Sequence, residues 1–301
     1  MSAGIALGGE ADGWLRDAVE AGGGRIVPLG QAEALIWGGG DADQLRAMLA
    51  AAPGLRWVQL PSAGVEQYLP LMGDGRTWTA AKGVFADQCA EQVLGLAIAG
   101  FRHLDAGARQ RRWHRGDGKS LFGASVAIVG GGGIAASTLR LLAPFRVEAT
   151  VVRRRPDPVP RARRTVPSSQ LMEVLKDADL VVLAAPLTAA TEGMIGAAQL
   201  RAMREDAWLI NVARGKLVRT PDLVRALQEG WIGGAGLDVT DPEPLPAGHP
   251  LWQFDNCIIT SHTANPPNLE RAVLGPRITE NVRRYVTGEP LLGGVDVEAG
   301  Y

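Results

Sequence analysis

The chain has 301 residues, 46% of them hydrophobic, and its formal net charge is −1. A chain of this length and composition can form two domains that each bury an apolar core. Its near neutrality argues against nucleic acid or an anionic membrane as a main partner.

Several further classes of protein are disfavoured by simple patterns. No apolar run reaches 18 residues, so we expect no transmembrane helix. The first residues lack the basic and apolar regions of a secretory signal, and we expect a cytoplasmic protein. The two cysteines, Cys89 and Cys257, stand in apolar surroundings and are expected to be small buried residues in a reducing compartment. No cysteine–histidine spacing indicates zinc, and we expect no metal.

The first hundred residues alternate between apolar runs and helical patterns. We expect strands at 4–7, 25–29, 34–37 and 55–60, and helices at 14–21 and 41–51, with Asp41 as a helix N-cap. This alternation predicts a small parallel α/β domain. The last strand leads into Pro61 to Val65. This segment is either a plain turn or a loop whose Gly64 and Val65 N–H groups hold a carboxylate, and the residues alone leave both possibilities open.

A strong helix is expected at 87–104, where apolar residues recur at the spacing of one broad helix face. That face predicts burial between domains or subunits. The segment 109–118 that follows is polar and basic, and includes Trp113 and His114. It is either an exposed crossing into the next domain or an arm that grips a second subunit.

A glycine turn follows the apolar strand predicted at 126–129. The pattern G-x-G-x-x-G/A is met by Gly130, Gly132 and Ala135, and a helix is predicted directly after it. Gly130 permits the tight turn, Gly132 lets a pyrophosphate approach the backbone, and Ala135 lets the helix lie close to the strand. The helix start then offers N–H groups to the phosphates. Four successive glycines could instead form a flexible turn, but the flanking strand and helix favour nucleotide binding.

The next predicted strand, at 148–152, ends in Arg153, Arg154 and Arg155. An NAD-binding unit places an acidic residue here to hold the ribose 2′-hydroxyl, and this chain has none. Arginine pairs well with phosphate, so we expect NADP to be preferred, with NAD still possible. Arg161, Arg163 and Arg164 add positive charge that we expect to lie nearby. The alternative is a solvated basic loop.

Four more buried strands are predicted, at 180–184, 209–212, 235–239 and 257–260. Ionisable residues lie at or just after the ends of three of them, namely Arg214, Asp238, Glu243 and His262. The carboxyl ends of parallel strands share one edge, and that edge faces the nucleotide in open α/β sheets. The convergence therefore predicts a catalytic site.

At this point the chain resembles the D-isomer-specific 2-hydroxyacid dehydrogenases, and in particular their NADP-type glyoxylate/hydroxypyruvate reductases. The resemblance rests on LRWVQLPSAGV at 55–65, VAIVGGGGIA at 126–135, LINVARG at 209–215, GAGLDVTDPEPL at 234–245, PLW at 250–252 and IITSHTA at 258–264. It implies two doubly wound parallel-sheet domains and a homodimer. The Rossmann-type nucleotide domain would span 98–267. The flavodoxin-like substrate domain would span 1–97, joined by the C-terminal segment 268–301.

The resemblance also implies residue roles. Arg214 would bind the substrate, His262 would act as acid–base, and Glu243 would be its carboxylate partner. The expected cofactor contacts are Gly130, Gly132, Gly133, Ile134, Arg153, Arg154, Pro186, Val212, Ala213, Asp238 and Ala264, with Asp238 at the nicotinamide end. The expected substrate contacts are Ala63, Gly64, Val65 and Arg214. Two positions depart from the family: Ser261 replaces the usual proline, and Gln92 stands where histidine is common after Glu91.

These residue types suit the reduction of a 2-keto acid to a D-2-hydroxy acid, in which NADP(H) exchanges a hydride with the substrate. A fixed arginine binds a carboxylate and polarises a carbonyl, and a histidine donates a proton near neutral pH. The alternative is a dinucleotide-sensing interaction module of the same fold without significant turnover, because a fold does not determine a function.

Overall fold

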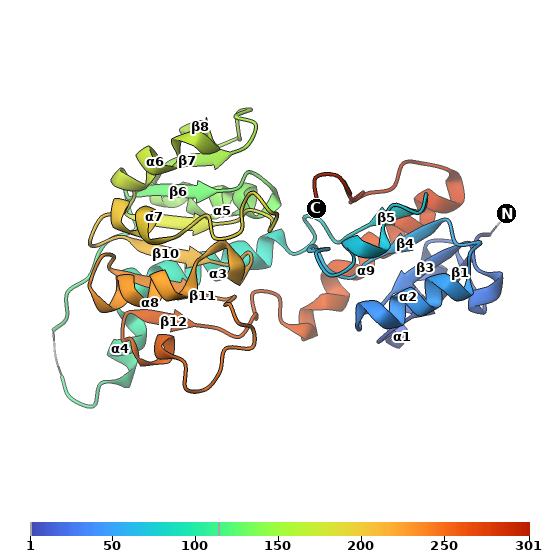
Figure 1. The fold of residues 1–301 in the computed structure, drawn as a ribbon, viewed down its shortest axis with the longest axis horizontal. Helices are drawn as coiled ribbons and strands as arrows, with labels where there is room; N and C mark the ends of the chain where they lie inside the picture. Colours follow the sequence, from blue (N-terminus) through green and yellow to red (C-terminus); the bar gives the residue numbers. More distant parts are fainter. Residues whose placement is uncertain (1, 114) are drawn as a thin grey trace. The chain divides into compact units, whose positions relative to one another are not determined.

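The computed structural model describes residues 2–113 and 115–301, so His114 of the basic segment lies outside the described residues. The chain forms two compact units (Figure 1). The terminal unit comprises Met1–Phe85 and Pro266–Tyr301, and the central unit comprises Ala86–Asn265. Both are built on parallel sheets, which confirms the predicted fold class.

The central unit has a seven-stranded sheet in which every pairing is parallel. Its strands are β6 (Ser125–Val129), β7 (Glu148–Arg153), β8 (Arg164–Pro167), β9 (Leu180–Leu183), β10 (Trp208–Asn211), β11 (Gly234–Leu237) and β12 (Cys257–Ile259). Their spatial order is β12-β11-β10-β9-β6-β7-β8. Counted from β6, this is the Rossmann order 3-2-1-4-5-6 with one strand added beyond the sixth.

Helices cover both faces of this sheet. The helices of the central unit are α3 (Ala86–Phe101), α4 (Leu104–Arg109), α5 (Gly133–Leu142), α6 (Leu171–Asp177), α7 (Ala197–Ala202) and α8 (Thr220–Gln228). On one face, α3 and α5 pack with Ile128, Val182 and Ile210. On the other face, α6, α7 and α8 pack with residues such as Val181 and Leu209. Successive strand residues therefore alternate between two apolar cores, as burial on both faces requires.

Helix α3 belongs to the central unit. Its residues Val93, Ala97 and Phe101 are buried in the core beneath α5. A side chain at Gly100 would meet the Trp208 ring at 2.3 Å, so glycine lets the helix lie close to the sheet. The boundary expected at residue 97 falls inside this helix, whereas the units divide at 85/86 and 265/266. Periodicity identifies an apolar face, but it does not identify the surface that covers it.

The terminal unit has a five-stranded parallel sheet in the order β2-β1-β3-β4-β5, which is the flavodoxin-like order. Its strands are β1 (Gly4–Gly8), β2 (Arg25–Ile26), β3 (Ala34–Trp37), β4 (Trp57–Gln59) and β5 (Thr77–Thr79). Its helices are α1 (Gly13–Ala21), α2 (Ala42–Ala51) and α9 (Pro267–Thr287). The predicted N-cap of α2 is confirmed, because the Asp41 carboxylate accepts a 2.7 Å hydrogen bond from the Gln44 N–H.

The C-terminal segment returns to the N-terminal strands. Helix α9 packs along α1, as Figure 1 shows. Asn281 on α9 is fully buried, and its amide nitrogen donates to Gln59 Oε1 at 2.8 Å and to the Leu292 carbonyl at 3.0 Å. Its amide oxygen accepts from the Leu292 N–H at 2.8 Å. One side chain thus ties β4, α9 and the tail together.

In the two stretches that the structure describes, no helix is both long enough and apolar enough to span a membrane.

Asn281→Ala should destabilise the terminal unit. The variant loses the three hydrogen bonds of a fully buried side chain and leaves the Leu292 N–H and carbonyl without these partners. A buried hydrogen bond is worth about 1 kcal/mol, so we expect the free energy of unfolding to fall by about 2–4 kcal/mol in urea titrations followed by circular dichroism. Glu20→Ala, on the exposed face of α1, is the control and should change it by less than about 0.5 kcal/mol. Equal urea midpoints of unfolding for Asn281→Ala and Glu20→Ala would contradict the stabilising role of Asn281.

Candidate active site

The carboxyl edge of the central sheet brings the predicted polar residues together. Arg214 follows β10, Asp238 directly follows β11, and His262 follows β12. The turn between β10 and Arg214 is held by the Asn211 side chain, whose amide donates to the Arg214 carbonyl at 2.9 Å. A side chain at Gly215 would lie 1.9 Å from the Thr240 carbonyl oxygen, so glycine lets this turn pack against the segment that follows β11.

His262 and Glu243 form a close pair, with the imidazole Nδ1 and Glu243 Oε1 2.6 Å apart. An ionised carboxylate can only accept, so Nδ1 carries the proton of this hydrogen bond. Nε2 is then the ring atom available to a substrate. Both side chains are exposed within the central unit, at 53% for His262 and 41% for Glu243. The histidine backbone is left-handed, with φ +53°, and its N–H donates to the Asp238 carbonyl at 2.8 Å.

Asp238 is only 1% exposed, and its carboxylate binds the segment that carries the histidine. Oδ1 accepts from the Thr260 hydroxyl at 2.6 Å and from the Thr263 N–H at 2.9 Å, and Oδ2 accepts from the Ala264 N–H at 3.0 Å. The sequence suggested a contact with the cofactor for Asp238. It did not suggest these hydrogen bonds to the histidine segment, because the donors lie 22 to 26 residues away from Asp238 in sequence.

The cysteines are free and half-buried. Burial, and to a smaller extent the charge of Asp238, raise the pKa of the Cys89 thiol to about 11, and the charge of Arg214 opposes this shift. Burial likewise raises the pKa of Cys257 to about 12, with a smaller contribution from Asp105. Both thiols therefore stay protonated near neutral pH and are poor nucleophiles.

The glycine turn has the geometry that the motif predicts. Gly130 has φ +114°, and a side chain there would lie 2.3 Å from the Ala184 carbonyl oxygen, so only glycine fits. Gly132 caps α5 and faces open space, and a methyl group at this position would have no atom within 4 Å. Ala135 is fully buried, which brings α5 close to the sheet. The start of α5 is thus accessible to a phosphate group.

Arg153 ends β7 beside this turn, and its side chain would be the nearest neighbour of a methyl group at Gly131. The expectation for Arg163 and Arg164 is wrong. Arg164 pairs in register with Thr150, and Arg163 forms an ion pair with Glu148, so both lie at the amino end of β7. Arg153 lies three positions beyond Thr150 along the strand, which is about 10 Å. Between β7 and β8 the chain returns from the carboxyl edge of the sheet to its amino edge, because the two strands are parallel. Arg163 and Arg164 therefore stand at the start of β8, a strand that the sequence did not reveal.

The other predicted cofactor residues also lie at the carboxyl edge of the central sheet. They are Gly133 and Ile134 in the first turn of α5, Arg154 after β7, Pro186 after β9, Val212 and Ala213 after β10, and Ala264 after β12. The predicted substrate residues Ala63, Gly64 and Val65 follow β4 in the terminal unit. There the Ser62 hydroxyl donates to the Gly64 carbonyl at 2.6 Å and holds the loop in a turn.

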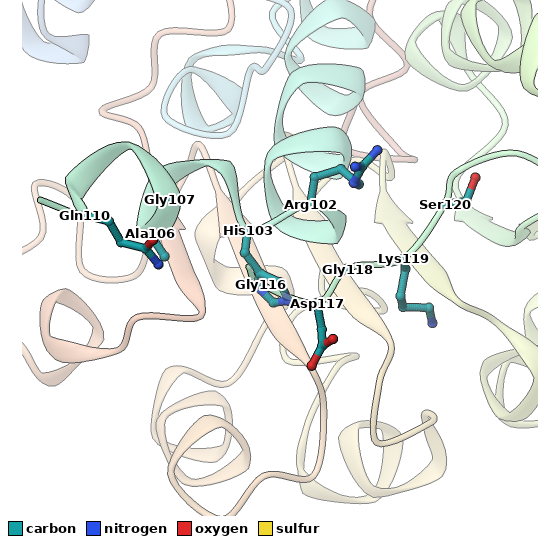
Figure 2. Close-up of a pocket in the computed structure, with 10 residues that line it drawn as sticks. All are labelled: Arg102, His103, Ala106, Gly107, Gln110, Gly116, Asp117, Gly118, Lys119 and Ser120. Atoms are coloured by element: carbon teal, nitrogen blue, oxygen red, sulfur yellow. The ribbon is translucent and has the colours of Figure 1, made fainter. Parts of the chain in front are cut away.

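A polar pocket of about 550 Å³ lies elsewhere, at the far end of α3 (Figure 2). It is lined by the end of α3, by α4 and by 116–120, and it contains none of the predicted site residues. Lys119 in its wall pairs with Asp179 and Asp206, which precede β9 and β10. This pocket is therefore at the amino edge of the sheet, opposite the histidine.

Two residues that the structure places in the candidate site were not predicted to belong to it. Gln92 on α3 donates to the Thr260 hydroxyl at 2.9 Å, and that hydroxyl in turn contacts Asp238. The sequence marked Gln92 only as a departure from a family pattern, and Thr260 only as the end of a strand. A contact between residues 168 positions apart leaves no local pattern.

Comparisons with known proteins identify one family of relatives. The family model for the NAD binding domain of D-isomer specific 2-hydroxyacid dehydrogenases matches residues 94–264. A protein in the proB 3′ region of Corynebacterium melassecola is 40% identical over 82% of this chain and 84% of its own length. The glyoxylate reductase of Thermofilum pendens is 34% identical over 80% of this chain and 75% of its own length. The human glyoxylate reductase/hydroxypyruvate reductase is 33% identical over 69% of this chain and 66% of its own.

Solved structures of the same family resemble this chain over nearly its whole length. The D-isomer specific 2-hydroxyacid dehydrogenase of Xanthobacter autotrophicus, in complex with NADPH and MES, has a TM-score of 0.87 at 27% identity and covers 100% of both chains. A family protein from Aeromonas salmonicida has a TM-score of 0.86 at 26% identity, covering 99% of this chain and 100% of that one.

Two alanine substitutions in the glycine turn should separate folding from nucleotide binding. Gly130→Ala forces a methyl group against the Ala184 carbonyl at an unfavourable φ, and should cost at least about 2 kcal/mol of unfolding free energy in urea. Gly132→Ala has room within the protein and should cost only about 1 kcal/mol, because alanine is a poorer helix N-cap than glycine. Its methyl group would occupy the space of the pyrophosphate, so NADPH should bind at least about 10-fold more weakly in fluorescence titrations. Unchanged NADPH affinity in Gly132→Ala would contradict this assignment.

Proposed function

The chain belongs to the D-isomer specific 2-hydroxyacid dehydrogenase family, and we propose that it reduces small 2-keto acids to D-2-hydroxy acids with NADPH as the preferred cofactor. The observation that carries the proposal is the 2.6 Å His262–Glu243 pair at the strand edge that also carries Arg214. An oxidoreductase of this kind needs a proton donor and a carboxylate-binding cation at one place, and this edge supplies both.

Each residue has a distinct part in the reduction. NADPH, when bound, supplies the hydride for the carbonyl carbon. Arg214 binds the substrate carboxylate with its planar guanidinium and polarises the carbonyl. His262 gives the carbonyl oxygen a proton from Nε2, because Nδ1 is held by Glu243. Glu243 orients the ring and stabilises its charged form before the proton leaves. We also propose that the Ala63–Val65 loop binds the substrate carboxylate through its backbone N–H groups.

The names of the relatives suggest the first substrates to test. Glyoxylate and hydroxypyruvate head the panel, since relatives are named for them, and pyruvate and phenylpyruvate extend it to larger side chains. Oxidation of NADPH is followed by absorbance. No turnover with any of these acids, together with tight nucleotide binding, would favour the dinucleotide-sensing module.

Two further proposals concern the state of the protein in the cell. We propose a homodimer on the family resemblance, and a cytoplasmic location because the two cysteines are free, as in a reducing compartment. Light scattering of the purified chain distinguishes one copy from two, and cell fractionation tests the location.

Removing the proton donor should abolish most turnover while nucleotide binding persists. His262→Ala should lower kcat by about 10²- to 10⁴-fold, which is the usual contribution of general acid catalysis. Glu243→Gln should move the fall in reduction rate to lower pH, because the imidazolium loses its anionic partner. Arg214→Lys should also be severely impaired, because a lysine lacks the bidentate fork. A wild-type rate in His262→Ala would show that the proton comes from another group.

The preference for NADPH should depend on Arg153. Charge-assisted hydrogen bonds to a 2′-phosphate are worth about 1.5–3 kcal/mol each, less where solvent screens them. We therefore expect kcat/KM to favour NADPH over NADH by about 10- to 100-fold, and the ratio to shrink as salt is raised.

Matched charge reversals test this dependence. Arg153→Asp should reverse the preference, because it removes an attraction and adds a repulsion. Arg163→Asp makes the same charge change at the opposite end of β7 and should leave the preference for NADPH in place. Equal kcat/KM values for the two nucleotides in the unmodified protein would mean that the arginine run is only a solvated loop.

A further inference from the structure

We propose that Thr260 and Gln92 are positioning residues that act on His262 through Asp238. This inference rests on the proposed acid–base role of His262. Neither residue contacts the imidazole in the hydrogen bonds described above. They act instead on the carboxylate that anchors the histidine segment.

The segment from Thr260 to Ala264 is attached to one residue at four points. The Asp238 carboxylate accepts from the Thr260 hydroxyl and from the N–H groups of Thr263 and Ala264, and the Asp238 carbonyl accepts from the His262 N–H. Asp238 is buried at the end of β11, in the interior of the sheet, so it is a rigid anchor. A buried carboxylate with several donors keeps a fixed orientation, and the segment follows that orientation.

The anchor is needed because the histidine backbone is unfavourable. His262 has φ +53°, a left-handed conformation that residues with a Cβ atom seldom adopt. Such a conformation persists only where the surrounding contacts overdetermine it. Losing one of the four attachments therefore allows the segment to relax and moves the imidazole away from its working position.

The direction of the hydrogen bonds makes Thr260 the link to a second element. A hydroxyl has one hydrogen, and the 2.6 Å contact with the Asp238 carboxylate requires it. The hydroxyl oxygen must then accept from Gln92 Nε2 at 2.9 Å. Gln92 Nε2 is also 3.5 Å from Asp238 Oδ1. The chain of donors thus runs from α3 through Thr260 to the carboxylate, and α3 itself is held by the core.

Substitutions at Thr260 separate the hydroxyl from the shape of the side chain. Thr260→Val keeps the volume and removes the hydrogen bond, and we expect kcat for keto-acid reduction to fall about 10-fold, because misplacement of a catalytic group by about 1 Å costs up to 100-fold. The KM for NADPH should change less than kcat, by no more than about 3-fold, because the expected phosphate contacts at the glycine turn and Arg153 are untouched and only the expected nicotinamide contacts at Asp238 and Ala264 are affected. Thr260→Ser restores the hydroxyl and should recover most of the lost kcat. Gln92→Met, close in shape to glutamine, should lower kcat by about 3-fold.

A double-mutant cycle gives the decisive readout. If Thr260 acts only through His262, adding Thr260→Val to His262→Ala should leave the residual rate of His262→Ala unchanged within about 2-fold. A general structural role would lower that residual rate by the same factor as in the wild-type background. That outcome would overturn the proposal, as would a kcat in Thr260→Val within about 2-fold of wild type.

Two other outcomes also test the proposal: a Thr260→Val variant that does not fold, and a His262→Ala variant that stays active. If Thr260→Val fails to fold in circular dichroism, Gln92→Met takes its place in the cycle, and an unchanged kcat in Gln92→Met overturns the proposal. If His262→Ala alone keeps the wild-type rate, the proposed function fails first. That result is distinct from an inactive His262→Ala combined with an unaffected Thr260→Val, in which only the positioning role fails.

Discussion

The parallel register of β10, β11 and β12 is the constraint on which the candidate site depends. In-register pairs such as Asn211 with Leu237 and Leu237 with Ile259 end the three strands at one level, so the loops that follow start side by side. The buried Asp238 carboxylate then joins the loops after β11 and β12 through hydrogen bonds. His262 and Glu243 are 19 residues apart in sequence. They meet because the strand ends place their loops side by side, and no local conformational preference of either residue brings them together.

The glycine turn and Arg153 lie at the same carboxyl edge of the central sheet. Gly130 turns the chain sharply after β6 because its positive φ and the nearby Ala184 carbonyl exclude any side chain. Gly132 leaves the start of α5 open, and Arg153 closes one flank of the turn. The glycine turn proposed to bind phosphate and the ionisable groups therefore lie at one edge of a single sheet, which is the arrangement expected where the chemistry occurs next to a bound dinucleotide.

Much of the fold could be predicted from the sequence because its signals are local. Buried parallel strands appear as short β-branched runs, and the Asp41 cap and the glycine turn depend on neighbouring residues. Strands β5 and β8 were missed because TWT and RTVP have too few apolar residues to stand out. The same omission led to the incorrect placement of Arg163 and Arg164. The Gln92–Thr260–Asp238 chain could not be predicted, since its members come from three distant segments. The roles of the site residues remain predictions.

The central claim is that this edge of the sheet delivers a hydride from NADPH to the carbonyl carbon of a 2-keto acid. It is tested most directly by supplying NADPH deuterated at both positions of nicotinamide C4, with glyoxylate as substrate, and analysing the product by NMR and mass spectrometry. The account predicts one deuterium on the carbon that was the carbonyl of glyoxylate, and none when the label is in the solvent instead. Product labelled only from deuterated solvent, or no product despite saturating NADPH, would contradict it.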